Sequence, residues 1–431
     1  MFKRILSLFL TVLLLTVLPA AAGAEELSQS DAVVASGTCG ENLTWVLNEE
    51  GTLTISGTGA MDNYVSDAYD EGEVEEPWSV YRWQILHVVA EEGVTSIGDF
   101  AFDGYSAIIS ATIPSTLESF GIYAFRDNCA LEAVYISDLA AWCELSFTIS
   151  SGDYRTNNPL FGAQNLYLNG ELVTDLVIPE GVTAINDGAF YNCSSISTVT
   201  LPTTVTTIGN YAFAYCSLAS VQFSEGLTTI EPYAFWCADL PEAELPEGLT
   251  TIESHAFDHC AVESISIPTT LTHIGEDAFY GLEDADCIKE VHLRDLGAWC
   301  NLEFEQATSN PASFDSANLY LNEELLTDVV IPEGTTLIKD CVFLNCDSLI
   351  GVTLPESLNQ IHWDVFADCD NLKRVTFLNA DTEIFSGAFA NCVKLTDIVL
   401  PENLDNISSS VFSGCTRLKR LALPEAVTEI S

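Results

Sequence analysis

Short stretches of alternating apolar and polar residues recur along most of the chain. A representative unit reads Leu-Pro-Thr-Thr-Val-Thr-Thr-Ile-Gly-Asn-Tyr-Ala-Phe-Ala-Tyr-Cys-Ser-Leu over residues 201–218, and Ala-Ser-Val-Gln-Phe follows it at 219–223. The Val-x-Leu-Pro and Val-x-x-Ile pieces are short and β-branched, which predicts brief strands. Proline ends the first strand because it cannot donate to a ladder of backbone hydrogen bonds. The Ala-Phe-x-x-Cys piece has its apolar residues at the spacing of a helix or a tight turn.

The unit repeats in steps of mostly 22 or 23 residues. The phenylalanine of an Ala-Phe or Val-Phe pair lies at positions 102, 125, 190, 213, 235, 257, 279, 343, 366, 389 and 412, and a cysteine often follows, at positions 193, 216, 260, 346, 369, 392 and 415. One unit is too small to bury a core, but stacked units bury a continuous column of Leu, Ile and Phe. The sequence therefore predicts a repeat solenoid, with degenerate coils in the two long gaps, between Phe125 and Phe190 and between Phe279 and Phe343.

A second level of repetition lies in those gaps. Residues 165–181 match residues 318–334 at 14 of 17 positions, and the segment Asp-Leu-Ala-Ala-Trp-Cys at 138–143 matches Asp-Leu-Gly-Ala-Trp-Cys at 295–300. We therefore expect two related blocks of about 155 residues each, produced by duplication.

The repeated markers resemble a known family. The Leu-Pro, Ile-Gly, Ala-Phe and Cys markers over 88–431 are similar to those of the BspA-like leucine-rich repeats, which are about 23 residues long and occur on exported and cell-surface proteins. The resemblance implies a leucine-rich-repeat-type right-handed coil of short β-strands joined by turns or short helices. The segments 37–45 and 51–59 resemble the β-rich segment that often precedes such arrays.

The start of the chain has three expected parts. A basic start, the apolar run 5–18 and Ala-Gly-Ala at 22–24 predict a secretory signal peptide over 1–24. A linker over 25–36 follows. Alternating Leu43, Trp45 and Leu47, a turn, and alternating Leu53 and Ile55 then predict a hairpin, so that residues 37–87 form a β-rich cap. The solenoid occupies 88–431. Its last repeat is incomplete, and we expect the chain to be a fragment of a longer product.

Charge narrows the function classes. The chain of 431 residues has 63 Asp and Glu against 14 Lys and Arg, a formal net charge of -49, yet 48% of its residues are hydrophobic, which excludes disorder. Residues 156–288 contain no Lys or Arg. Because binding a polyphosphate requires clustered cations, we expect no nucleic-acid partner. No second long apolar run follows the signal peptide, so we expect no membrane span after its cleavage.

No catalytic or metal motif stands out. The sequence has no G-x-S-x-G, H-E-x-x-H, G-x-G-x-x-G or P-loop pattern, so we predict that the protein is not an enzyme and has no cofactor. His255, His259, Cys260 and His273 could converge on zinc, but their repeat positions favour ordinary half-buried side chains. The acidic run before Pro77 is interpreted as a solvated loop without the spacing of an EF-hand; it comprises Asp67, Asp70, Glu71, Glu73, Glu75 and Glu76.

The cysteines invite a redox interpretation as well. Most of the 14 cysteines lie once per repeat in the same position after Phe, which favours small buried side chains packed on one another. Neighbouring coils about 4.8 Å apart would also bring such thiols within reach of a disulfide. Cys341 and Cys346 are the best candidates for a local bridge.

Basic residues gather only near the end of the chain. Aligned on the repeat cysteines, Lys373 shares a column with Lys419, and Arg374 shares one with Arg420, although Asp397 lies in the second column. This basic strip is a candidate partner-binding site, with local charge balance as the alternative; it comprises Lys373, Arg374, Lys394, Arg417, Lys419 and Arg420.

These observations favour an exported, non-enzymatic recognition protein, secreted or held at the cell surface. A solenoid offers a long surface whose exposed positions vary while its core stays constant. The resemblance implies adhesion to host or neighbouring-cell proteins or to matrix glycoproteins. The alternative is a repeat scaffold or accessory part of a larger secreted protein, whose catalytic or wall-binding domain lies beyond Ser431. The sequence does not identify the ligand or the oligomeric state.

Overall fold

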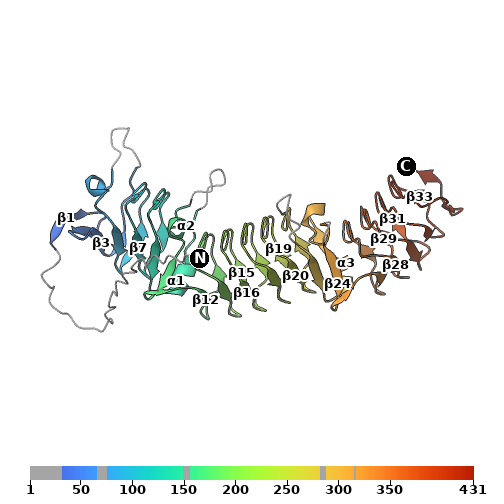
Figure 1. Ribbon diagram of the computed structural model, residues 1–431, viewed down its shortest axis with the longest axis horizontal. Helices are drawn as coiled ribbons and strands as arrows, with labels where there is room; N and C mark the ends of the chain where they lie inside the picture. The colour runs from blue at the N-terminus through green and yellow to red at the C-terminus, as the bar shows by residue number, and fades with distance from the viewer. Residues whose placement is uncertain (1–31, 66–74, 149–155, 282–287, 315–316) are drawn as a thin grey trace, which may run out of the picture.

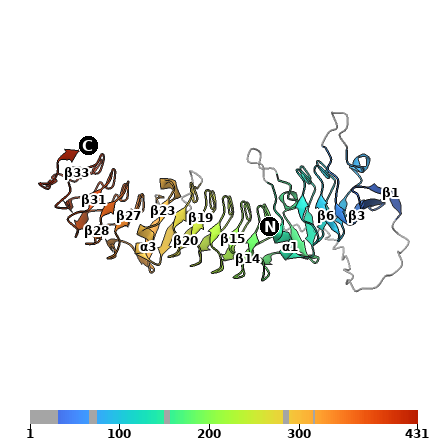
Figure 2. The same cartoon turned by 180° about the vertical axis from the view of Figure 1, so that it is seen from behind.

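The protein is an elongated stack of coils (Figures 1 and 2). The computed structural model describes residues 32–65, 75–148, 156–281, 288–314 and 317–431. The predicted signal peptide, and the part of the acidic run from Asp67 to Glu73, lie outside the described residues. Within them, no helix combines the length and the apolarity that crossing a membrane requires.

The N-terminal cap is a small antiparallel sheet that continues into the solenoid. Its strands are β1 (Val33–Thr38), β2 (Leu43–Asn48) and β3 (Thr52–Gly57), and β3 pairs in parallel with the first solenoid strand, β5 (His87–Ala90). The predicted hairpin is β2 and β3, whose alternating apolar side chains are buried. Strand β1 begins inside the segment expected to be a linker, and its largely exposed side chains gave no alternating pattern to reveal it.

Each regular coil contributes one strand to a parallel ladder, which we call the long ladder. Its first strands are β5, β7 (Ser110–Ile113), β9 (Ala133–Ile136) and β10 (Leu166–Leu168). The ladder continues through β12 (Asp175–Val177), β14 (Thr198–Thr200), β16 (Ser220–Gln222), β18 (Glu242–Glu244), β20 (Ser264–Ile267), β22 (Glu290–Leu293), β24 (Asn318–Leu321), β26 (Asp328–Val330), β28 (Gly351–Leu354), β30 (Arg374–Phe377) and β32 (Asp397–Val399).

A second parallel set, the short ladder, follows the turn after the long-ladder strand, which contains a proline in most coils. Its strands are β4 (Gly59–Ala60), β6 (Val94–Ile97), β8 (Ser119–Phe120), β13 (Ala184–Ile185), β15 (Thr207–Ile208), β17 (Thr229–Ile230), β19 (Thr251–Ile252), β21 (His273–Ile274), β23 (Glu303–Phe304), β27 (Leu337–Ile338), β29 (Gln360–Ile361), β31 (Glu383–Ile384), β33 (Asn406–Ile407) and β34 (Glu429–Ile430).

The Ala-Phe piece closes each coil as a series of turns, which we call the turn ridge. Neighbouring turns bond to one another: the amide of Phe213 donates to Ala234 O at 2.8 Å, and that of Phe235 donates to Ala256 O at 2.8 Å. The phenylalanine rings are buried and stacked, with Phe213 lying 5.3 Å from Phe190 and 5.5 Å from Phe235 between ring centroids. These turns therefore build the continuous aromatic column that the sequence predicted.

The cysteines of the repeat lie beside this column as small buried side chains. The thiol of Cys216 donates to Phe190 O at 3.1 Å, and the thiol of Cys369 donates to Phe343 O at 3.0 Å. Burial raises the pKa of Cys193 to about 11, which keeps the thiol protonated. Cys341 and Cys346, the candidates for a local bridge, are free thiols in this structure.

Variant coils fill the two long gaps. Each contains a short helix, α1 (Leu139–Glu144) or α3 (Leu296–Cys300), capped by the side chain of Asp138 or Asp295. Each also contains a hairpin that ends one sheet of the long ladder, formed by β10 with β11 (Glu171–Leu172) and by β24 with β25 (Glu324–Leu325). The remaining short helices are η1 (Ser79–Tyr81), α2 (Leu160–Ala163) and η2 (Ala307–Ser309).

The long ladder is also interrupted between β16 and β18. In neighbouring coils the residue before the strand donates its amide to the previous coil, as Ala219 does to Ser197 O at 2.7 Å and Glu263 does to Pro241 O at 2.8 Å. Pro241 occupies this position before β18 and has no N–H to donate. The ladder is therefore divided at a point that the sequence determines.

Candidate interaction surface

Threonine repeats along the middle coils of the short ladder. Threonines from successive coils bond to the backbone of the coil before them: Thr228 Oγ1 donates to Thr206 O at 3.0 Å, and Thr250 Oγ1 donates to Thr228 O at 3.1 Å. Thr272 Oγ1 continues the series to Thr250 O at 3.1 Å. Since these hydroxyls hold adjacent coils together, the threonines of these coils have a structural role.

The long ladder combines a constant inner face with a varied outer face. The inward residues are buried and aliphatic in successive strands: Val199, Val221, Ala243, Ile265, Val291 and Leu319. The outward residues that follow them differ from coil to coil in size, charge and hydrogen-bonding character: Thr200, Gln222, Glu244, Ser266, His292 and Tyr320. We call these outward positions of the long ladder the recognition face.

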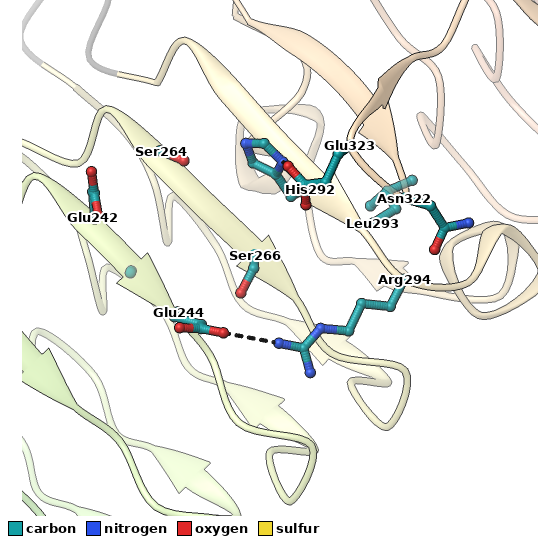
Figure 3. Close-up of a pocket in the computed structure, with 10 residues that line it drawn as sticks. Glu242, Glu244, Ser264, Ser266, His292, Leu293, Arg294, Asn322 and Glu323 are labelled. Atoms are coloured by element: carbon teal, nitrogen blue, oxygen red, sulfur yellow. Dashed lines mark hydrogen bonds and ion pairs between the residues drawn. The ribbon is translucent and has the colours of Figure 1, made fainter.

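A shallow groove lies on this face where serines separate larger side chains (Figure 3). It has a volume of about 300 Å³ and crosses β18, β20 and β22. Ser264 and Ser266 lie between the glutamates of β18 and His292 of β22, so that their small side chains leave the hollow. The lining residues are Glu242, Ala243, Glu244, Ser264, Ser266, His292, Leu293, Arg294, Asn322 and Glu323.

Contacts with carboxylates hold Arg294 and His292 in the groove. Arg294 spans two carboxylates, with Nη2 at 3.3 Å from Glu244 Oε1 and Nη1 at 3.0 Å from Glu247 Oε1, and Figure 3 shows it reaching toward Glu244. His292 Nδ1 lies 3.3 Å from Glu323 Oε2. The imidazole also stacks on Tyr320, with ring centroids 5.0 Å apart.

The groove is acidic, because Glu242, Glu244 and Glu323 outnumber Arg294 among its lining residues. Burial acts to raise the pKa of Glu247, but hydrogen bonds from Thr269 and Arg294 outweigh it, and the pKa of this carboxyl is lowered. Glu247 therefore stays charged. An acidic hollow lined by rigid strands fits a cationic group of a partner better than an anionic one.

The histidines considered as zinc ligands contact a carboxylate instead. His255 Nδ1 lies 3.0 Å from Asp258 Oδ2, and His259 Nδ1 lies 2.5 Å from Asp258 Oδ1, so that both imidazoles are directed at one carboxylate. Cys260 is buried beside the phenylalanine column, and His273 lies in the short ladder. Across the described ranges, no three His, Cys, Asp or Glu side chains are grouped to hold a metal ion.

The acidic run is only partly described, and one of its members differs from expectation. Glu76 was expected in a solvated loop but is 4% exposed. Its carboxylate accepts a hydrogen bond of 2.5 Å from Tyr105 Oη and pairs with Arg82 at 3.3 Å. The partners lie 6 and 29 residues away in the sequence, and only folding brings them together.

The six residues of the basic strip differ in their contacts. Arg374 forms an ion pair with Asp328 two coils away, across Gly351, which has no side chain to separate them. Lys394 Nζ donates to Asn371 Oδ1. In the described part of the chain the other four, which are exposed, form no ion pair: Lys373, Arg417, Lys419 and Arg420.

Sequence reasoning missed a group of aromatic side chains on the turn ridge. Tyr191, Tyr211 and Ala214 form a second buried cluster, with Tyr233 and Trp236 packed against it. Within the Ala-Phe-x-x-Cys piece these positions resembled core residues. The signal was the accumulation of Tyr, Trp and His around Phe213, Phe235 and Phe257, where other coils have Gly, Asn or Asp.

Comparisons with known proteins agree with this architecture. A leucine-rich repeat protein from Bacteroides ovatus is 22% identical, covers 90% of this chain and 94% of its own, and has a TM-score of 0.52, which shows a shared fold. A leucine-rich repeat protein from Eubacterium ventriosum is 22% identical over 92% and 94% of the two chains (TM-score 0.35), and a leucine rich cell surface protein from Faecalibacterium prausnitzii is 21% identical over 92% and 94% (TM-score 0.27).

Family membership rests on the repeats themselves. No curated protein matches the chain. The model of the BspA type leucine rich repeat region matches six copies, over residues 79–151, 163–285 and 316–431, which together are more than half of the chain. With its coils stacked as the repeats predicted, this chain belongs to the BspA-type leucine-rich repeat family.

Proposed function

We propose that the protein is an extracellular, non-enzymatic recognition protein that binds protein or glycoprotein ligands on a cell surface or in a matrix. The observation that carries the proposal is the contrast between the two ladders. From residue 206 to residue 272 the short ladder repeats threonine, whereas over residues 200–320 the recognition face changes its side chain from coil to coil. A binding surface requires such variation, and coil stacking does not.

Two further observations support it. BspA-type leucine-rich repeat proteins are typically found at the cell surface, in agreement with the proposed secreted or surface location. The groove offers fixed carboxylates on rigid strands, and charge complementarity of this kind gives selectivity and rapid association with a basic partner surface.

A cell-binding assay tests this function. Fluorescently labelled protein is added to intact epithelial and bacterial cells, before and after protease treatment of their surfaces. We expect saturable binding that protease treatment removes, because the ligand is a protein or glycoprotein. The absence of saturable binding, or binding that protease treatment leaves unchanged, contradicts the proposal.

Matched variants locate the binding face. Replacing Glu244 and Glu323 with Lys should weaken binding at least tenfold, because like charges then meet at the interface. The control replaces Glu118 and Glu383, exposed carboxylates on the side of the short ladder, with the same charge change. Equal losses in both variants would indicate that overall charge, and not the recognition face, determines binding.

The exposed members of the basic strip provide a second, smaller contact in this proposal. Lys373, Lys419 and Arg420 lie near the C-terminal end of the array and would meet acidic groups of the partner. Such exposed charges are screened by salt beyond about 8 Å at physiological ionic strength. Replacing these residues with Glu should reduce both the affinity for the partner and the dependence of that affinity on salt. An unchanged salt dependence would mean that the basic strip only balances nearby charges of the chain and does not contact the partner.

A further inference from the structure

Exposed aliphatic side chains lie on the outer side of the long ladder at its first hairpin. Tyr167 of β10 is opposite Leu172 of β11, so that both side chains are on one face of the sheet. Leu172 is 43% exposed, and Val177, an outward residue of the next strand β12, is 61% exposed. We call Tyr167, Leu172 and Val177 the first hairpin patch. Single exposed aliphatic residues are common, whereas a group of them with a polar border is typical of a contact with another protein.

The second hairpin carries an equivalent group. Tyr320 of β24 is opposite Leu325 of β25, and Val330 is an outward residue of β26. Leu325 is 44% exposed and Val330 is 69% exposed. We call Tyr320, Leu325 and Val330 the second hairpin patch. The two patches therefore agree in residue type, in position on the hairpin and in exposure.

The two matching hairpin segments are identical at these exposed positions but differ in the core. They differ at three positions, of which one is in the hairpin turn. The other two are buried: Val173 corresponds to Leu326, and Leu176 corresponds to Val329. Packing alone favours the opposite pattern, because volume changes are costly in a core and exposed side chains can vary freely. The identity of the exposed residues therefore indicates that both patches make the same contact.

Carboxylates border both patches. Glu171 and Asp175 are exposed beside the first patch, and residues 156–288 contain no Lys or Arg that could pair with them. At the second patch Arg374 pairs with Asp328. There Glu324 is exposed, and Glu323 takes the turn position that Gly170 has in the first hairpin.

Each patch thus keeps two exposed carboxylates that, within the described residues, pair with no Lys or Arg: Glu171 and Asp175, and Glu323 and Glu324. An apolar surface with an acidic border is complementary to aliphatic side chains that have basic residues beside them. This complementarity defines the chemistry of the partner.

We propose that each hairpin patch binds aliphatic side chains flanked by basic residues on a partner protein, so that one chain holds two copies of the same partner. The inference rests on the proposed function and specifies the number of sites and the chemistry of the ligand. Strand β24 is the seventh long-ladder strand after β10. Because neighbouring strands are about 4.8 Å apart, the patches are roughly 34 Å from each other along the stack. Two small domains fit side by side at this distance.

Nuclear magnetic resonance of the whole chain with labelled leucine and valine methyl groups reports on each patch separately. The probe is the capped peptide Lys-Leu-Lys-Leu-Lys-Leu-Lys, titrated at about 150 mM salt, where distant charges are screened. The control peptide has serine in place of each leucine and the same charge. We expect the methyl signals of Leu172 and Leu325 to respond at half-saturating concentrations within about threefold of each other. The leucine peptide should need concentrations at least about fivefold lower than the serine peptide, because only leucine buries apolar surface.

Two variants serve as controls for each other. Val177→Thr introduces the residue of position 200, which pairs with it in the next coil, and Val330→Thr likewise introduces the residue of position 353. Threonine keeps the branched shape that suits a strand, so both variants should fold, which circular dichroism checks. Val177→Thr should raise the half-saturating concentration at Leu172 by about threefold or more and leave Leu325 unchanged, and Val330→Thr should do the reverse.

Three results would overturn the proposal: a response at one patch alone, equal responses to the two peptides, or a single variant that weakens both patches. The cell-binding assay separates this proposal from the proposed function. If cells bind the protein but the patches do not respond to the leucine peptide, the two-site proposal fails and the proposed function stands. If both patches respond but cells do not bind the protein, the patches are binding sites and the proposed role at the cell surface fails.

Discussion

Truncation of one ring in the phenylalanine column, Phe213→Ala, should break the cooperativity of the array. The ring is fully buried and stacks on Phe190 and Phe235. Phe→Ala changes in packed cores cost about 3–5 kcal/mol, which includes the cavity that remains. The two stacked pairs, each contributing about 0.5–1.5 kcal/mol beyond buried area, place this site toward the upper end. Because each coil contacts only its neighbours, the loss should be local.

Hydrogen exchange followed by mass spectrometry measures this effect coil by coil. A local loss of about 3 kcal/mol speeds exchange through opening by roughly a hundredfold, since 1.4 kcal/mol is a factor of ten. We expect this change in residues 198–230 and much less beyond 320. The control Phe161→Ala removes a ring that is 41% exposed and should change exchange little. Unchanged protection around Phe213, or a uniform loss along the whole array, would refute the reasoning.

Three further predictions concern individual contacts. Burial and neighbouring carboxylates raise the pKa of Glu231, so the charged carboxylate destabilises the folded state at neutral pH. Glu231→Gln should therefore raise the melting temperature at pH 7, and this gain should vanish below the ordinary glutamate pKa of about 4.3. A gain that persists at pH 3 would disprove this cause. In Gly351→Ala, the new Cβ would lie 2.5 Å from Asp328 Oδ1 and 2.9 Å from Arg374 Nε, which should break the exposed ion pair between these residues. The free energy of unfolding in urea should fall by less than about 1 kcal/mol. A loss above about 2 kcal/mol would show that this pair stabilises the fold more than exposed pairs usually do. Trp299→Phe removes the 3.1 Å indole donor of Val342 O, which keeps a longer hydrogen bond of 3.3 Å from Asn310 Nδ2. The loss should cost about 0.5–1.5 kcal/mol by the same measurement, and a neutral result would refute that role.

The architecture could be predicted because its causes are periodic. The spacing of Phe213 and its equivalents, the Leu-Pro pairs and the cysteine positions all report the same inward-facing column, and the structure buries them together. Strand β1 escaped prediction because its side chains are largely exposed and impose no pattern. The fold could thus be inferred wherever buried residues recur at a regular spacing in the sequence.

The candidate sites were harder to predict from the sequence because their contacts join residues of different coils. Arg374 reaches Asp328 across 46 residues, and only the missing side chain of Gly351 allows the contact. The spacing of His255 and His259 resembled a metal site, but the structure directs both rings at Asp258. The group of aromatic side chains on the turn ridge was missed because left-handed turns direct some side chains of the Ala-Phe piece away from the phenylalanine column, and sequence spacing does not show this.

The central claim is that the recognition face, and not the short ladder, contacts the ligand. Two histidines report on the two faces: His292 is an outward residue of the long ladder, and His273 is an outward residue of the short ladder, and both are half-buried. Their rates of modification by diethyl pyrocarbonate are measured by mass spectrometry with and without cell-surface protein that binds the chain. The account predicts that the ligand slows modification of His292 and leaves His273 unchanged. Protection of His273 with an unchanged rate at His292 would contradict it.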